Sequence, residues 1–234
     1  AAGARIFPRY RVTNVGSGLV EGVVTDDSGR VIGVLKVTAD AVVLAAGAIS
    51  SPRLLLDSEV VDTDGPVGAG LRVHPVAAAH AMLDHPVWRA GATQGHFIDE
   101  WDSDAYLLEA NPIIPGGIFQ VLAANGPELQ EILLRSTHFV STGAMIRDTS
   151  QGRVHKSTGA GASISYSVND VDRDRLIQGI QKGAELWFDG ANAEFVIPSV
   201  FGVPICRSMD ELINATPSDL PASRLLLYAS HPQA

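Results

Sequence analysis

Cysteine is almost absent from this 234-residue sequence, in which Cys206 is the single thiol. One cysteine cannot form a disulfide within the chain or build a cysteine-based metal site. The histidines do not take its place, because His80 and His85 have a spacing that fits neither one helix face nor one strand face. Three further histidines each stand alone: His96, His138 and His155. We therefore predict no metal site.

Positive charge is also scarce. Lysine and arginine number 17 against 26 acidic residues, so the formal net charge is -9. No basic stripe is present that would neutralise nucleic-acid phosphates, and the same deficit disfavours an anionic membrane surface. The composition therefore argues against a nucleic-acid-binding protein.

Long apolar runs are missing as well. The longest, "AVVLAAGAI" and "PVAAAHAML", fall far short of the roughly 20 residues that span a bilayer. No charged-then-apolar signal peptide opens the chain. We therefore predict no transmembrane segment and favour a cytoplasmic location. The opening "AAGARIFPRY" has no initiator methionine and is typical of the interior of a longer chain.

The first part of the chain has the pattern of an α/β fold. Strands are predicted in "ARIFPRYRVTNV" and in a hairpin over residues 19–38, whose turn is Asp26–Gly29. The continuous apolar run Ala41–Leu44 predicts a strand that is covered on both faces. After a turn of small residues, Pro52 suits the first turn of a helix.

A loop rich in glycine and proline, residues 59–75, is the predicted boundary. Beyond it the pattern is that of an α+β fold. Strands are predicted within residues 75–91, 95–101, 137–148, 153–157, 162–169 and 193–200. Helices are predicted over residues 126–136, 171–190 and at the start of 206–224. Asn169 or Asp170 caps the second helix, and Gly190 ends it. The buried face of that helix is predicted to comprise Leu176, Ile180, Ala184 and Trp187.

The small residues that follow the run Ala41–Leu44 allow a backbone or a ligand to come very close. At the carboxyl end of a parallel strand, such a turn is where α/β folds bind nucleotides. Tight packing of a strand on a helix explains the same residues equally well.

Three longer motifs favour the first interpretation. They are "GAISSPRLLLDS" over residues 47–58, "VGAGLRVHP" over residues 67–75, and Ser230-His231-Pro232. In this order they resemble the signature regions of the glucose–methanol–choline (GMC) flavoprotein oxidoreductases. The sequence departs from the family at residues 59–61, where Glu-Val-Val replaces the common Gly-Ile-Gly. The stretches "LRVHPVA" and "THFVSTGAMIRD" are similar to the long-chain alcohol oxidase and bacterial dehydrogenase branches.

The resemblance implies a domain organisation. Residues 1–72 would form part of an FAD-binding, Rossmann-like domain, and residues 73–224 a substrate-binding domain with an antiparallel sheet and helices on one face. Residues 225–234 would return as a strand to the flavin site. The family's N-terminal Gly-x-Gly-x-x-Gly, which holds the FAD diphosphate, has no counterpart in the sequence. We therefore expect an N-terminal portion of the FAD domain upstream, and little FAD binding or activity from these 234 residues alone.

The resemblance also implies roles for particular residues. Val12 matches a backbone contact to the adenine of FAD, and Ala46 and Gly47 match a turn against the ADP half. His231 matches the base that takes the hydroxyl proton of a primary or secondary alcohol while hydride passes to FAD. An apolar alcohol is the small-molecule partner that we expect. His74, in the second motif, is interpreted as structural.

Two other functions stay open at this stage. A serine hydrolase is the less favoured one, because no Gly-x-Ser-x-Gly elbow occurs among the many serines. A non-catalytic domain that binds an apolar ligand or a partner protein is the other, since an apolar pocket on a sheet serves either purpose.

Overall fold

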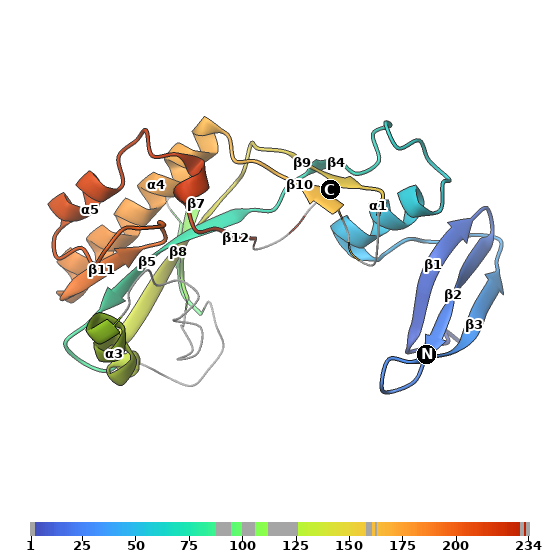
Figure 1. Ribbon diagram of the computed structural model, residues 1–234, viewed down its shortest axis with the longest axis horizontal. Coiled ribbons are helices and arrows are strands. Elements are labelled where there is room, and N and C mark those ends of the chain that lie inside the picture. The colour runs from blue at the N-terminus through green and yellow to red at the C-terminus, as the bar shows by residue number, and fades with distance from the viewer. Residues whose placement is uncertain are drawn as a thin grey trace. The chain divides into compact units, whose positions relative to one another are not determined.

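Figure 1 shows the computed structural model of the chain, which describes residues 3–87, 95–99, 106–111, 126–157, 161, 163–229 and 232. The chain divides into two compact units. Unit 1 comprises residues 1–72, 151–167 and 232–234, and unit 2 comprises residues 73–150 and 168–231. Residues 151–167 thus belong with unit 1, although the sequence alone assigned them to the second domain. The roles assigned to the two parts stay predictions.

The first sheet of unit 1 is antiparallel and consists of β1 (Tyr10–Gly16), β2 (Leu19–Thr25) and β3 (Val31–Thr38) in that order. Its β2–β3 connection is the hairpin turn that the sequence predicts. The carboxylate of Asp26 accepts hydrogen bonds from the backbone N–H groups of Ser28 and Arg30, at 3.0 and 2.9 Å. Gly29 adopts a φ of 81°, which glycine reaches without steric cost.

The predicted strand Ala41–Leu44 does not form. Residues 41–45 have no regular structure, and the side chain of Val43 is 88% exposed. A strand covered on both faces needs hydrogen-bonding neighbours, and among the described residues no strand pairs with this run. The helix that follows, α1 (Gly47–Asp57), begins earlier than expected, so that Pro52 lies inside it rather than in its first turn.

Residues 151–167 join unit 1 through a second antiparallel sheet. Its strands are β4 (Ala69–Leu71), β9 (Gly152–His155) and β10 (Ser163–Ser165), in the order β10-β9-β4. The backbone N–H of Val154 donates to the carbonyl of Gly68 at 2.8 Å. This pairing explains why a segment so late in the sequence packs with the first unit.

Unit 2 is built on a six-stranded sheet in the order β11-β5-β8-β7-β6, with β12 pairing the start of β5. Every strand pair in it is antiparallel. The strands are β5 (Pro75–Met82), β6 (Phe97–Ile98), β7 (Tyr106–Ala110), β8 (Phe139–Ile146), β11 (Phe195–Pro198) and β12 (Tyr228–Ala229). Strand β12 is shorter than the strand that the sequence predicts from Leu225. Leu225 itself forms a single isolated bridge with Val200.

Helix α4 (Asp170–Glu185) packs across β5 and β8, as Figure 1 shows. The contact is close because glycines face the sheet: a Cβ on Gly183 would lie 3.3 Å from that of Ala79, and one on Gly179 only 2.3 Å from that of Ala144. Leu176, Ile180 and Ala184 are buried in this layer, which confirms the predicted helix face. Trp187, on the turn that continues to Gly190, is partly buried beside them.

Two more helices, α3 (Gly126–Leu134) and α5 (Met209–Ala215), belong to unit 2. Leu212 of α5 joins the core around α4, and Cys206 is buried in the same cluster. Within the described part of the chain, no helix combines the length and the apolar character that crossing a membrane requires.

Candidate functional site

A cavity of about 840 Å³ lies beside the start of α1 in unit 1, at the first of the three sequence motifs. It is lined by Leu44, Ala45, Gly47, Ala48, Ser51, Pro52, Leu55 and Pro66–Ala69. The first two motifs, separated by the variable stretch in the sequence, therefore form the walls of one cavity. The apolar lining suits a partly apolar ligand.

Ala46 and Gly47, two predicted cofactor residues, form the N-terminal end of α1. Ala46 is the residue before the helix, and its backbone N–H donates to Ser51 Oγ at 3.0 Å. No side chain caps the helix and no acidic residue lies in its first turn. The first-turn N–H groups and the positive end of the helix dipole therefore remain suited to an anion such as a phosphate of FAD.

Backbone conformation, rather than steric crowding, explains why position 47 requires glycine. Its φ is 85°, and a Cβ built on it would meet nothing within 4 Å. A larger residue would thus strain the backbone turn that starts the helix and would project into open space. These features fit a cofactor lying against this turn.

Val12, the third predicted cofactor residue, lies on β1 and does not line this cavity. The β1–β2 register shifts between Val12 and Asn14, which marks an irregularity in the strand. Opposite it, a Cβ on Gly22 would lie 2.9 Å from Val12 Cα. The two backbones approach closely there, and Val12 is exposed.

His231, the predicted base, lies outside the described residues. Tyr228, three residues earlier, is described and lies on β12, which pairs with the first residues of β5. Strand β12 is therefore the described strand that lies nearest in sequence to the predicted catalytic position.

The face of the unit 2 sheet that points away from α4 carries a row of polar side chains. His80 and Ser141 are direct cross-strand neighbours, and Glu109 lies on the same face, opposite Gly143. Asn111, just after β7, extends the row, since its N–H donates to the carbonyl of Ser141 at 2.9 Å. Sequence reasoning missed this row because its members come from three strands and only the register aligns them.

His80 is a buried, neutral imidazole. Its Nε2 lies 3.3 Å from Ser199 Oγ, and its ring stacks on Phe139 with centroids 6.0 Å apart. Burial lowers the pKa of His80 to about 4. Both His80 and Ser199 are almost fully buried, so this serine and histidine have no open path to a substrate.

A second serine–histidine contact joins Ser165 Oγ and His155 Nε2 at 2.8 Å, on the paired strands β10 and β9. A catalytic triad needs an acid that orients the other ring nitrogen of the histidine. Among the described residues, neither His155 nor His80 has a carboxylate bonded to that nitrogen. The structure therefore offers no support for the hydrolase alternative.

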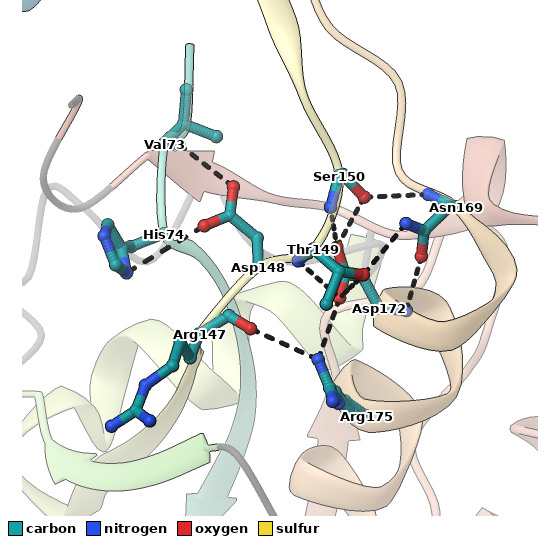
Figure 2. Close-up of polar contacts among 9 residues, drawn as sticks. All are labelled: Val73, His74, Arg147, Asp148, Thr149, Ser150, Asn169, Asp172 and Arg175. Carbon is teal, nitrogen blue, oxygen red and sulfur yellow. Dashed lines mark hydrogen bonds and ion pairs between the residues drawn. The ribbon is translucent and has the colours of Figure 1, made fainter. Parts of the chain in front are cut away.

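A buried carboxylate, Asp172, is the centre of a second polar cluster in unit 2 (Figure 2). Its oxygens accept hydrogen bonds from the backbone N–H and hydroxyl groups of Thr149 and Ser150, and from Arg175 at 3.2 Å. Burial alone would raise the pKa of Asp172, but the bonds from Ser150 and Thr149 outweigh it and hold that pKa below its ordinary value. Its acceptor positions are occupied, which indicates a structural role.

Asp148 and His74 form the neighbouring part of this cluster. The backbone N–H of Val73 donates to Asp148 Oδ2 at 3.1 Å, and His74 Nδ1 lies 4.0 Å from Asp148 Oδ1. His74 has an unusual φ of 45° for a residue other than glycine. Figure 2 shows these side chains beside the Asp172 cluster, where they fix the start of β5. The contacts of His74 agree with the structural interpretation of this histidine.

Comparison with known proteins places these features in a family. A model of the GMC oxidoreductase family matches residues 1–76. Two uncharacterized GMC-type oxidoreductases of Mycobacterium tuberculosis, from strains CDC 1551 and H37Rv, are each 32% identical over 244 residues, which cover 99% of this chain and 37% of the relative. A long-chain-alcohol oxidase of Arabidopsis thaliana is 25% identical over 172 residues, or 68% of this chain and 22% of that protein. The chain thus spans 37% of the length of its mycobacterial relatives.

Proposed function

The chain belongs to the GMC oxidoreductase family, and from this we propose that it functions in the FAD-dependent oxidation of an alcohol to a carbonyl compound. The observation that carries the proposal is the cavity at the start of α1. Its uncapped helix end and its glycine at positive φ lie on the motif for which the family resemblance implies FAD contact.

We propose that the turn Ala46–Gly47 holds the ADP half of FAD, and that the backbone of Val12 contacts the adenine. The N–H groups at the start of α1 would donate to phosphate oxygens, and the helix dipole would add to this attraction. When bound, FAD supplies an acceptor for the hydride that leaves the alcohol carbon.

His231 is the proposed base for the O–H proton of the alcohol. A neutral imidazole accepts a proton readily near neutral pH, and its ring nitrogen would take this proton as the C–O bond gains double-bond character. Residues 73–224 are proposed to bind the rest of the alcohol, with residues 225–234 carrying the base. An apolar alcohol is the preferred substrate, in keeping with the long-chain-alcohol oxidase among the relatives.

The test uses the full-length gene product, purified and examined for the visible absorbance of bound flavin. Anaerobic addition of primary alcohols of increasing chain length should bleach this absorbance. His231→Gln should retain flavin and slow the bleaching by about 10²- to 10⁴-fold, the usual worth of a general base. His85→Gln is the matched control, because the His85 side chain is 60% exposed and its ring Nδ1 contacts the neighbouring Asp84. Bound flavin that no alcohol reduces would overturn the proposal.

A further inference from the structure

Residues Pro66–Ala69, which form one wall of the cavity at α1, are held by the late strand β9. The backbone N–H of Val154 donates to the carbonyl of Gly68 at 2.8 Å. Ala69 pairs with Arg153 where β9 lies beside β4 (Figure 1). The approach is close, since a Cβ on Gly68 would lie 2.3 Å from the carbonyl oxygen of Val154. A strand far along the chain therefore sets the backbone path of this cavity wall.

The side chain of Arg153 extends the contact to the residues that lead into the wall. Its Nη2 donates hydrogen bonds to two backbone carbonyls, those of Thr63 at 2.8 Å and of Gly65 at 2.7 Å. Both acceptors lie in the variable stretch between the first two motifs. Because both belong to the backbone, the contact fixes the course of the chain independently of the side chains in that stretch.

Two turns connect the anchored carbonyls to the cavity. The N–H of Gly65 donates to the carbonyl of Asp62 at 3.1 Å, and the N–H of Ala69 donates to that of Pro66 at 3.0 Å. Residues 62–64 are exposed, and a surface turn closed by one backbone hydrogen bond opens readily. The bonds from Arg153 hold the first turn, and the pairing with β9 holds the second.

We propose that Arg153 is a positioning residue of the cofactor cavity, which holds Thr63 and Gly65 so that Pro66–Ala69 form an ordered wall beside the ADP half of FAD. This inference rests on the function proposed above, which assigns FAD to this cavity. A wall that is ordered before the cofactor arrives binds it more tightly, because no chain entropy is then lost on binding. The inference gives β9, which the sequence assigned to the substrate-binding domain, a role in cofactor binding.

The experiment measures the affinity for FAD of the full-length protein after its flavin has been removed. Arg153→Met keeps an apolar stem but removes the donors. We expect it to raise the dissociation constant of FAD by about tenfold or more, the effect of losing a hydrogen bond from a charged group. Arg30→Met is the matched control and should leave the affinity unchanged. The Arg30 side chain belongs to the same unit, is 79% exposed and pairs with Asp26 in the hairpin turn.

Arg153→Lys separates the two hydrogen bonds from the positive charge. Lysine keeps the charge, but its ammonium lies one bond closer to the backbone than Nη2 does and cannot reach both carbonyls. We therefore expect Arg153→Lys to lose nearly as much affinity as Arg153→Met, and it provides the same comparison if Arg153→Met does not fold. Unmodified affinity in Arg153→Lys would show that charge alone suffices and would overturn the inference.

Two further measurements distinguish positioning from a general loss of structure. In the flavin-free protein, the Ala69 amide should exchange its hydrogen faster in Arg153→Met, whereas the amides that join β2 to β3 should keep their rates. At saturating FAD, the rate of flavin reduction by alcohol should equal that of the unmodified protein, because Arg153 acts only on the cavity wall. Faster exchange in both places, or slower reduction at saturation, would overturn the inference.

Failure of this inference can be told apart from failure of the proposed function. If the unmodified protein binds FAD, and Arg153→Met and Arg30→Met bind it with equal affinity, the inference is overturned and the function stays in place. An unmodified full-length protein that binds no FAD would overturn both.

Discussion

Asp172 accepts hydrogen bonds from both the backbone N–H and the side-chain hydroxyl of Ser150, 22 residues before it in the chain. Asn169 caps the same helix, since its side chain accepts the N–H of Asp172 at 2.9 Å. One carboxylate therefore ties the start of α4 to the end of the segment after β8. Its side chain is fully buried, and it is held at every acceptor position (Figure 2).

We predict that Asp172→Ala lowers the free energy of unfolding by about 3 kcal/mol, because the donors of Thr149 and Ser150 become buried without partners. Asp170→Ala, in the same helix turn, is the control. The Asp170 side chain is 88% exposed, and its ion pair with Arg173 should be worth less than about 1 kcal/mol. Urea unfolding measures both, and equal losses would contradict the structural role of Asp172.

The lowered pKa of Asp172 adds a pH dependence to this prediction. The carboxylate contributes stability above its unfolded pKa of 3.8, and that contribution is lost as the pH falls below this value. Urea unfolding between pH 3 and 6 should therefore show a loss of stability at the acid end that is smaller in Asp172→Asn. The same dependence of the free energy of unfolding on pH in both proteins would contradict this prediction.

Protonation of His80 gives a separate loss of folding stability in acid, which begins at a higher pH than the loss caused by Asp172. Its pKa falls from 6.5 to about 4 in the folded chain, so the unfolded chain binds a proton that the folded chain refuses. Stability should be complete above pH 6.5 and should decline as the pH falls toward 4, by roughly 3 kcal/mol at most. NMR of the His80 ring should show no titration between pH 7 and 5, with His80→Leu identifying the signal. A midpoint near 6.5 would contradict the prediction.

Substitutions at Gly68 and Gly70 distinguish the cost of backbone strain from the cost of steric crowding. Both have positive φ, at 84° and 75°, but a Cβ on Gly68 would lie 2.3 Å from the carbonyl oxygen of Val154, whereas one on Gly70 meets nothing within 4 Å. Gly70→Ala should cost about 1 kcal/mol from strain alone, and Gly68→Ala at least twice as much. Hydrogen exchange of the Val154 amide measures both, because this N–H donates to Gly68. Equal exchange in the two variants would contradict the predicted clash.

The sequence predicted those elements whose signals are local. The turn Asp26–Gly29 carries its own hydrogen-bonding chemistry, and the spacing of Leu176, Ile180 and Ala184 indicates a helix whatever it packs on. The prediction of a strand at Ala41–Leu44 was wrong because an apolar run only permits a strand. Whether the strand forms depends on neighbouring strands that can pair with it.

The polar groups of unit 2 depend on contacts that no local pattern reports. Tyr228 meets Asn111 only through the register of β12, β5, β8 and β7. For Asp172 a weak signal was present, since an acid three residues after the capping Asn169 is common at helix starts. Nothing in the sequence indicated that Thr149 and Ser150 would be its partners.

Gly47 tests the proposed cofactor site. Gly47→Asp would place a negative charge at the start of α1, and we predict that it weakens FAD binding to the full-length protein by about tenfold or more. Gly29→Asp is the matched control, with the same added charge and a similar φ of 81° in the hairpin turn, where a Cβ also meets nothing within 4 Å. Equal FAD affinity in the two variants would argue against FAD at this helix end.

The most direct test of the proposed function is anaerobic reduction of the flavin in the full-length protein. We predict bound flavin whose visible absorbance bleaches on addition of an alcohol, rapidly in the unmodified protein and very slowly in His231→Gln. Bleaching at the same rate in both proteins would contradict the assignment of His231 as base. A purified protein without flavin, or one whose flavin no alcohol reduces, would contradict the proposed oxidation itself.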